Sequence, residues 1–259
     1  MNGRLLGTGH EPGATEVEQL PIYGEAVRGT RHRLEPLILP TTNAATILAA
    51  EPSCFADKSA SIRTFTCATS LILCDHEITL RPFEAQDVEM LYEATIESLA
   101  DLCGWMNWCR QDYSLDHCRQ FLAQSAAEWE SGEAYNFAIV DSSDQSLCGS
   151  IGLNRIDYAV GSANVGYWVR RSKSGRGIAS KALRLSGRFA FEELRLERVE
   201  IVVPQGNLAS RRVAEKAGAR LNADLLKNVV LNDQSLEAHV YWLLPLVCTQ
   251  SAGATSVSS

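Results

Sequence analysis

The stretch "SKSGRGIASKALRLSGRFAF", residues 172–191, contains no acidic residue, although the chain of 259 residues carries a formal net charge of -7 at pH 7. The region without acids extends over residues 158–191. Its cations are Arg170, Arg171, Lys173, Arg176, Lys181, Arg184 and Arg188. Such a local reversal of charge in an acidic protein indicates that this region meets a negatively charged ligand.

Two glycines of this stretch separate a predicted strand at residues 163–169 from a predicted amphipathic helix at about residues 178–194. Gly175 and Gly177 permit a tight turn and let a ligand approach the backbone closely. The amides of residues 175–180 lie in or before the first helical turn, where they have no internal acceptor and where the helix dipole adds positive potential. This pattern is typical of a phosphate-binding loop; the alternative is an ordinary turn with a solvated basic face. The spacing fits neither a Walker A loop nor a dinucleotide fingerprint.

The segments around the loop predict an α/β domain with element order β-α-α-β-β-β-α-β-α-β-β. Ser114 and Gly132 are the predicted N-cap and C-cap of the second helix. Strands that first form a meander and then alternate with helices predict a mixed sheet with helices on both faces. The predicted strands are residues 77–83, 135–141, 146–156, 163–169, 199–203, 225–231 and 237–246, and the predicted helices are residues 87–99, 114–132, 178–194 and 207–219.

Composition sets wider limits on the class of protein. Hydrophobic residues make up 46% and charged residues 21% of the chain, which is typical of a soluble globular protein. No apolar run is long enough to span a bilayer, no signal-peptide pattern is present, and the acidic balance disfavours nucleic-acid binding. We expect a cytoplasmic protein with an N-terminal extension of uncertain order (residues 1–75), one folded domain (residues 76–248) and a disordered tail (residues 249–259).

The chain has eight cysteines and no C-x-x-C pair. A chain of this length and apolar content does not need a disulfide framework, so we expect free, largely buried thiols. The closest approach to a zinc-binding pattern, Cys109 with His117 and Cys118, has poor spacing. We therefore expect no metal site.

Two longer stretches resemble a known family. "VGYWVRRSKSGRGIASKAL" (residues 165–183) and "RVEIVVPQGNLASRRVAEKAGA" (residues 198–219) are similar to the GNAT superfamily of N-acetyltransferases, in its RimJ/RimL-type branch. The family motif [QR]-x-x-G-x-[GA] matches residues 174–179, with Ser174 in place of the usual Gln or Arg, and N-x-x-S matches Asn207 and Ser210. "LRPF", "GWMNW", "GLNRID" and "HVYWLLP" also suit the branch, so the resemblance covers about residues 78–247. It implies a mostly antiparallel GNAT-like central sheet.

The resemblance implies that the anion is the pyrophosphate of acetyl-CoA, a co-substrate. Its phosphates would lie on the backbone of Ser174, Gly175, Arg176, Gly177, Ile178, Ala179 and Ser180, with Arg176 and Arg170, Arg171 or Lys173 nearby. The pantetheine arm would pair with the backbone of Trp168 and Val169, where that strand separates from residues 199–203. Asn207 would bind the pantetheine, cap its helix, or do both.

The implied reaction is attack of an amine on the thioester carbonyl. Ser210 would donate to the leaving thiolate, with a simple hydroxyl at a helix start as the alternative. Many relatives place Glu where this chain has Asn164, so the base stays open among Asp157, Glu133 and His239, of which we select Asp157; His239 is more typical of a packed strand residue. Trp105 and Trp108 would line the acceptor pocket, or form a separate core cluster.

The acceptor stays open between a protein N-terminal α-amine, which the branch favours and which includes ribosomal proteins, and a small-molecule amine. A second class of function is a non-catalytic module that binds acyl-CoA or a partner, because Ser174 and Asn164 depart from the family pattern. A homodimer is one alternative for the assembly state.

Overall fold

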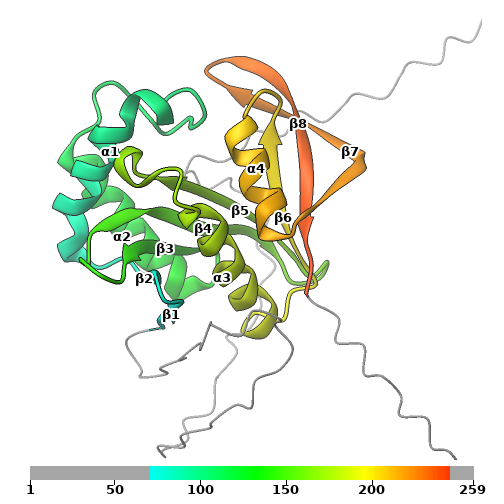
Figure 1. Cartoon of the computed structure of the whole chain (residues 1–259), viewed down its shortest axis with the longest axis horizontal. Helices are drawn as coiled ribbons and strands as arrows, with labels where there is room; N and C mark the ends of the chain where they lie inside the picture. The colour runs from blue at the N-terminus through cyan, green and yellow to red at the C-terminus, as the bar shows by residue number, and fades with distance from the viewer. Residues whose placement is uncertain (1–70, 246–259) are drawn as a thin grey trace, which may run out of the picture.

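A computed structural model of the chain describes residues 71–245 of the 259 (Figure 1). The predicted tail at residues 249–259 and all but residues 71–75 of the predicted extension lie outside the described residues. The fold begins earlier than predicted, because β1 (Leu73–Cys74) pairs with β2 (Ile78–Pro82). Sequence reasoning missed this strand because two residues are too short to show an alternating pattern.

The remaining elements follow the predicted order. Within the described residues the helices are α1 (Val88–Leu102), α2 (Leu115–Ser131), α3 (Ile178–Glu192) and α4 (Leu208–Ala217). The strands after β2 are β3 (Tyr135–Asp141), β4 (Leu147–Asp157), β5 (Ser162–Val169), β6 (Arg198–Pro204), β7 (Arg220–Leu231) and β8 (Gln234–Leu243). Ser114 and Gly132 cap α2 as predicted.

The strands form one sheet in the order β1-β2-β3-β4-β5-β6-β8-β7. Every neighbouring pair is antiparallel except β5 and β6, which are parallel. The sheet is therefore mixed and mostly antiparallel, as predicted. The single parallel junction divides it into an arm of β1–β5 and an arm of β6–β8.

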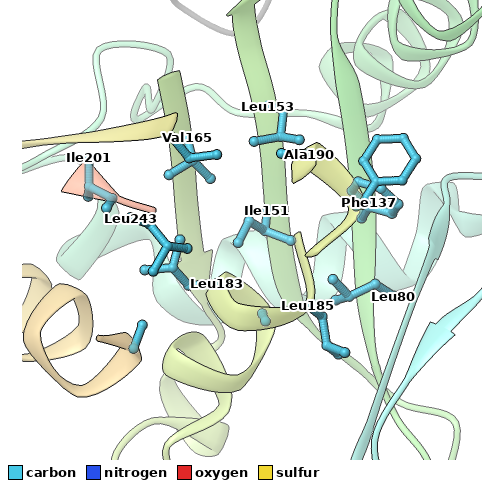
Figure 2. Close-up of a cluster of buried hydrophobic side chains, with 14 of the residues drawn as sticks. Leu80, Phe137, Ile151, Leu153, Val165, Leu183, Leu185, Ala190, Ile201 and Leu243 are labelled. Atoms are coloured by element: carbon cyan, nitrogen blue, oxygen red, sulfur yellow. The ribbon is translucent and has the colours of Figure 1, made fainter. Parts of the chain in front are cut away.

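Helices cover both faces of the sheet. Successive strand residues point to opposite sides, so each strand contributes apolar side chains to two cores. In β3, Phe137 and Ile139 pack in one core with side chains of α3 and α4, whereas Ala138 and Val140 pack in another with side chains of α1 and α2. Figure 2 shows the first core between the strands and α3. Burial of each large apolar side chain there stabilises the fold by about 1.5–3 kcal/mol.

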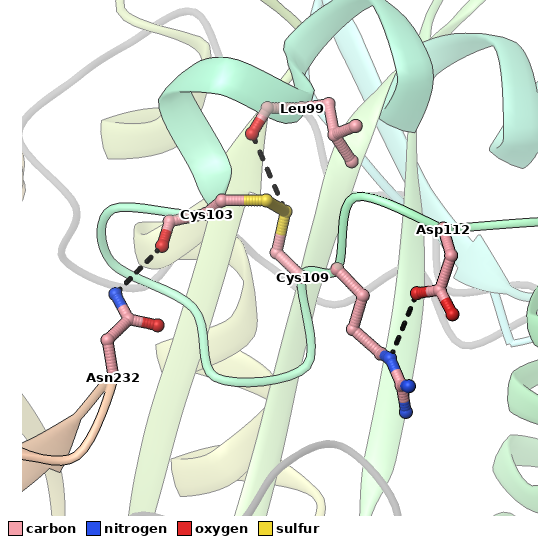
Figure 3. Close-up of a disulfide and its surroundings, with 6 residues drawn as sticks. Leu99, Cys103, Cys109, Asp112 and Asn232 are labelled. Atoms are coloured by element: carbon pink, nitrogen blue, oxygen red, sulfur yellow. Dashed lines mark hydrogen bonds and ion pairs between the residues drawn. A yellow bond between two sulfur atoms is a disulfide. The ribbon is translucent and has the colours of Figure 1, made fainter.

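The prediction that the cysteines are free is wrong for one pair. Cys103 and Cys109 form a disulfide, with their Cα atoms 4.8 Å apart, whereas Cys74, Cys118 and Cys148 are free among the described residues (Figure 3). The chain reverses direction after α1, where the amide of Met106 donates to the Leu102 carbonyl. This reversal brings together two cysteines whose spacing gave no signal in the sequence.

Candidate active site

A cavity of about 610 Å³ lies where the two arms of the sheet separate. β5 and β6 pair only at their first residues, from Ser162–Arg198 to Asn164–Glu200, although β5 continues to Val169 and β6 to Pro204. The facing edges therefore diverge, as predicted for this junction. The cavity wall includes residues of β5, β6, α3, α4 and the segment after α1, and we call it the central cavity.

One end of the central cavity is formed by residues 174–180, the glycine loop. Gly175 and Gly177 both have φ of 78°, a conformation that strains any residue with a Cβ. The first helical hydrogen bond of α3 runs from the Lys181 amide to the Gly177 carbonyl. Among residues 71–245, the amides of residues 175–180 consequently have no protein acceptor. Several unpaired donors and the positive end of a 15-residue helix make this end a binding site for an anion.

The cations just before the glycine loop are engaged with acids rather than directed at a ligand. Arg170 pairs with Glu97 at 2.5 Å, and Arg171 pairs with Asp101 at 2.9 Å. The Ser172 amide also donates to Glu97, at 2.7 Å. Hydrogen bonds from Ser172, together with the Arg170 guanidinium, lower the pKa of Glu97 from 4.5 to about 2.

Lys173 is held in the same manner, with its Nζ 3.0 Å from Asp141 and from Asp144. Arg170, Arg171 and Lys173, which were expected near the phosphates, thus all have acidic partners, and Lys173 also lines the central cavity. The acid-free stretch is compensated by acids on α1 and on the β3–β4 turn, which are distant in sequence. The pairs anchor the segment that leads into the glycine loop.

Positive charge also reaches the central cavity from α4. Arg212 and Lys216 line the wall, and neither has an acidic partner within residues 71–245. The Nζ of Lys216 would lie 3.2 Å from a Cβ placed on Gly177, so this cation stands over the glycine loop. Sequence reasoning missed both cations, although a spacing of four residues on a helix places them on one face. Arg176 is exposed and does not belong to the cavity wall.

Two hydroxyl groups meet in the middle of the central cavity. The Ser210 Oγ lies 3.0 Å from the Tyr167 Oη, and either oxygen can donate. The Asn207 Oδ1 accepts the Ser210 amide at 3.0 Å, so Asn207 caps α4 and also lines the wall. Burial raises the pKa of Tyr167 to about 12, which keeps this phenol protonated and able to donate at neutral pH. Tyr167 was missed because it lies within a strand, although it points to the same face as Val165 and Val169.

Most residues predicted for the site come together on this wall. They are Trp105, Trp108, Trp168, Val169, Ser174, Gly175, Gly177, Ile178, Ala179, Ser180, Asn207 and Ser210.

The three candidate bases do not join them. Asp157 is exposed, and its carboxylate accepts the amides of Ala159 and Val160 in the β4–β5 turn. Glu133 and His239 also lie off the wall. Among the described residues that line the cavity, Asp101 alone carries a carboxylate, and it is paired with Arg171.

The position where many relatives have glutamate is occupied by Asn164, which lines the cavity and donates to the Asn154 Oδ1 at 3.0 Å. Neither amide can take up a proton at neutral pH. The wall thus offers hydrogen-bonding groups, including the hydroxyls of Tyr167 and Ser210, but no unpaired carboxylate in the described residues.

A sheet divided at one parallel junction, with an anion-binding helix start beside the resulting cavity, is the arrangement that the resemblance to N-acetyltransferases implied. Comparison with known proteins places the chain within that class. Residues 77–220 match the acetyltransferase (GNAT) domain, so the chain belongs to the GNAT acetyltransferase family. This confirms the resemblance that the glycine loop and α4 had indicated.

Curated relatives agree with this assignment. The chain is 34% identical over 158 residues to "Probable N-acetyltransferase YjcK" of Bacillus subtilis (strain 168), which covers 60% of this chain and 87% of that protein. It is 27% identical over 173 residues to "Ribosomal-protein-serine acetyltransferase" of Escherichia coli (strain K12), covering 67% and 96% respectively. The protein is thus an N-acetyltransferase by family, as predicted.

Solved structures share the fold. Microcin C7 self immunity acetyltransferase MccE, solved with acetyl-CoA and AMP, is 22% identical with a TM-score of 0.62, covering 66% of this chain and 94% of that chain. RimL, the ribosomal L7/L12 alpha-N-protein acetyltransferase, solved with coenzyme A, is 21% identical with a TM-score of 0.60, covering 67% and 97%. Homologues of the family thus bind acetyl-CoA or CoA.

No group of three or more His, Cys, Asp or Glu side chains within residues 71–245 could hold a metal ion. Over the same residues, no helix combines the length and apolar character needed to cross a membrane.

Proposed function

We propose that the protein transfers the acetyl group of acetyl-CoA to the α-amine at the N-terminus of a protein. The observation that carries the proposal is the run of unpaired amides at residues 175–180, which opens onto a cavity that continues to Ser210 and Tyr167. The pyrophosphate binds these amides, and Lys216 and Arg212 add positive charge. Ser174, in place of Gln or Arg, removes one side-chain contact and leaves the backbone donors in place.

The gap between β5 and β6 accommodates the pantetheine arm. Beyond Asn164 the edge of β5 no longer pairs with β6, so the backbone of Trp168 and Val169 is available on that side. An extended chain with amide groups pairs with such an edge as an additional strand would. Asn207, at the start of α4, borders the same gap.

The protein contributes two hydrogen-bond donors to the reaction. The neutral amine attacks the thioester carbonyl and forms a carbon–nitrogen bond, while a backbone N–H near Trp168 or Val169 stabilises the negative charge on the oxygen. Collapse of this intermediate breaks the carbon–sulfur bond, and the amine loses a proton to water. The Ser210 hydroxyl, held by Tyr167, donates to the leaving thiolate.

The lack of an unpaired carboxylate on the described wall favours an α-amine over a lysine side chain. With pKa values of about 8 and about 10.4, roughly a quarter of an α-amine but only about a thousandth of a lysine is neutral at pH 7.5. An α-amine therefore needs little help from a base, and water suffices. The name of the Escherichia coli relative, a ribosomal-protein-serine acetyltransferase, supports a protein rather than a small molecule as the acceptor for this chain.

The test offers acetyl-CoA with three matched acceptors, and follows free thiol release and the gain of one acetyl group by mass. The acceptors are peptides with free N-termini, the same peptides with a blocked N-terminus and an internal lysine, and small primary amines. We expect turnover with the free N-termini alone. Preference for lysine or for small amines would replace the proposed acceptor, and saturable acetyl-CoA binding without turnover would favour a binding module.

A further inference from the structure

Residues 103–109, the tryptophan loop, lie between α1 and α2 and contribute to the wall of the central cavity. Four consecutive residues of this loop, from Trp105 to Trp108, line the cavity. The disulfide between Cys103 and Cys109 joins its two ends (Figure 3). It does not by itself fix the direction in which the tip of the loop points.

The tip is held by a side chain that reaches the other arm of the sheet. The Nδ2 of Asn107 donates to the Val230 carbonyl at 2.7 Å, and the Asn107 Oδ1 accepts the Asn232 amide at 3.3 Å. The Asn232 Nδ2 in turn donates to the Cys103 carbonyl at 3.1 Å. Three hydrogen bonds thus join the tryptophan loop to the end of the β7–β8 hairpin, across a separation of more than 120 residues in sequence.

The two tryptophan rings of this loop contact different elements of the fold. Trp105 extends toward the β6–α4 turn, where its ring lies 3.8 Å from the Cβ position of Gly206. Trp108 packs toward Trp168 of β5, with ring centroids 6.3 Å apart. The loop therefore spans the gap between the arms, one ring toward each. Asn107 lies between the two tryptophans in the sequence, and its side chain is hydrogen-bonded to the arm of β6–β8.

We propose that Asn107 is a positioning residue for the acceptor. It holds Trp105 and Trp108 in the wall of the central cavity by locking the tryptophan loop to the β7–β8 hairpin. This inference rests on the proposed function, because it assigns the tryptophan end of the cavity to the acceptor amine. The role depends on an amide side chain, since one group must donate to a carbonyl and accept an amide at the same time.

The sharpest variant is Asn107→Asp, which preserves size and replaces the donor facing the Val230 carbonyl with an oxygen. Two acceptors then face each other and the loop is released. The matched control is Asn228→Asp, the same change on β7 and away from the cavity wall. We expect Asn107→Asp to raise the KM for an N-terminal peptide about tenfold, with kcat and the Kd for acetyl-CoA within about twofold of the original. The control changes none of these quantities.

Hydrogen–deuterium exchange separates this inference from the proposed function. In Asn107→Asp, the amides of residues 104–108 should exchange faster, whereas those of residues 175–180 should not change. Unaltered exchange at residues 104–108 would overturn the inference, even if the acceptor is not an N-terminus. A parallel loss of acetyl-CoA affinity would also overturn it, because the change would then act on the whole fold. If no N-terminal peptide is acetylated by the original protein, the proposed function fails instead.

Discussion

The glycine loop and the tryptophan loop border the same cavity, but they present different groups to it. The glycine loop offers backbone amides that have no acceptor within residues 71–245. The tryptophan loop offers large side chains, and it is held by a disulfide and by Asn107. The difference teaches that one part of a cavity wall can be shaped by local backbone geometry, whereas another depends on side chains that distant contacts hold in place.

The largest effect is expected from a substitution in the glycine loop. Gly177→Glu places a Cβ at a position where φ is 78°. It also places a carboxylate among the amides that we propose bind the phosphates. We expect acetyl-CoA affinity to fall at least a hundredfold, on the order of two charge-assisted contacts, as measured by calorimetry.

Gly132→Glu is its control, because Gly132 has φ of 73° at the end of α2 and lies off the cavity wall. Both changes should strain the backbone similarly, but only Gly177→Glu should lose the ligand. If the two variants bound acetyl-CoA equally well, the glycine loop would not be the phosphate site.

The next effect concerns the hydroxyl pair between the loops. Ser210→Ala removes the Oγ near Tyr167 and leaves the backbone amide that Asn207 caps, so α4 keeps its start. We expect kcat to fall roughly a hundredfold, while the Kd for acetyl-CoA stays within about twofold.

Tyr167→Phe should have a smaller effect, about tenfold, because the serine hydroxyl remains and loses only its partner. Losses of kcat and of affinity in equal proportion would instead mark Ser210 as a purely structural residue.

The same contrast explains what could be predicted from sequence. The glycine loop, the caps of α2 and the motif at Asn207 and Ser210 depend on residues within a few positions of one another, so their patterns were legible. The divergence of β5 and β6 was expected from the family resemblance. In each case the determining interaction is local, or is shared by a whole family.

Features made by distant contacts were not predicted. The acid-free stretch suggested cations turned toward a ligand, but Arg170 and Lys173 meet Glu97 and Asp141, which other elements supply. The disulfide and the bonds of Asn107 depend on how the chain reverses after α1 and on the position of the β7–β8 hairpin. The spacing of residues in the sequence does not indicate such long-range contacts.

A milder change loosens the tryptophan loop at its ends. In the double variant Cys103→Ser/Cys109→Ser, or in the presence of a dithiol reductant, the loop gains conformational freedom while Asn107 still holds its tip. We expect the KM for the acceptor to rise about threefold, without change in acetyl-CoA affinity. Cys74→Ser is the control, because it removes a free thiol of β1. A change in acetyl-CoA affinity would mean that the two ends of the cavity are not independent.

The smallest expected effect lies at Glu97, where the segments leading to the two loops meet. Glu97 belongs to α1, which leads into the tryptophan loop, and it binds Arg170 and Ser172 just before the glycine loop. Its pKa is lowered to about 2, so its contribution to stability is present above about pH 4.5 and is lost as the pH falls toward 2. The difference in the free energy of unfolding between the original protein and Glu97→Gln should follow this course, and Glu93→Gln, at an exposed neighbour on α1, is the matched control variant. A difference that persisted at pH 2 would show that Glu97 acts by packing rather than by charge. The two loops would then share a rigid support instead of an electrostatic one.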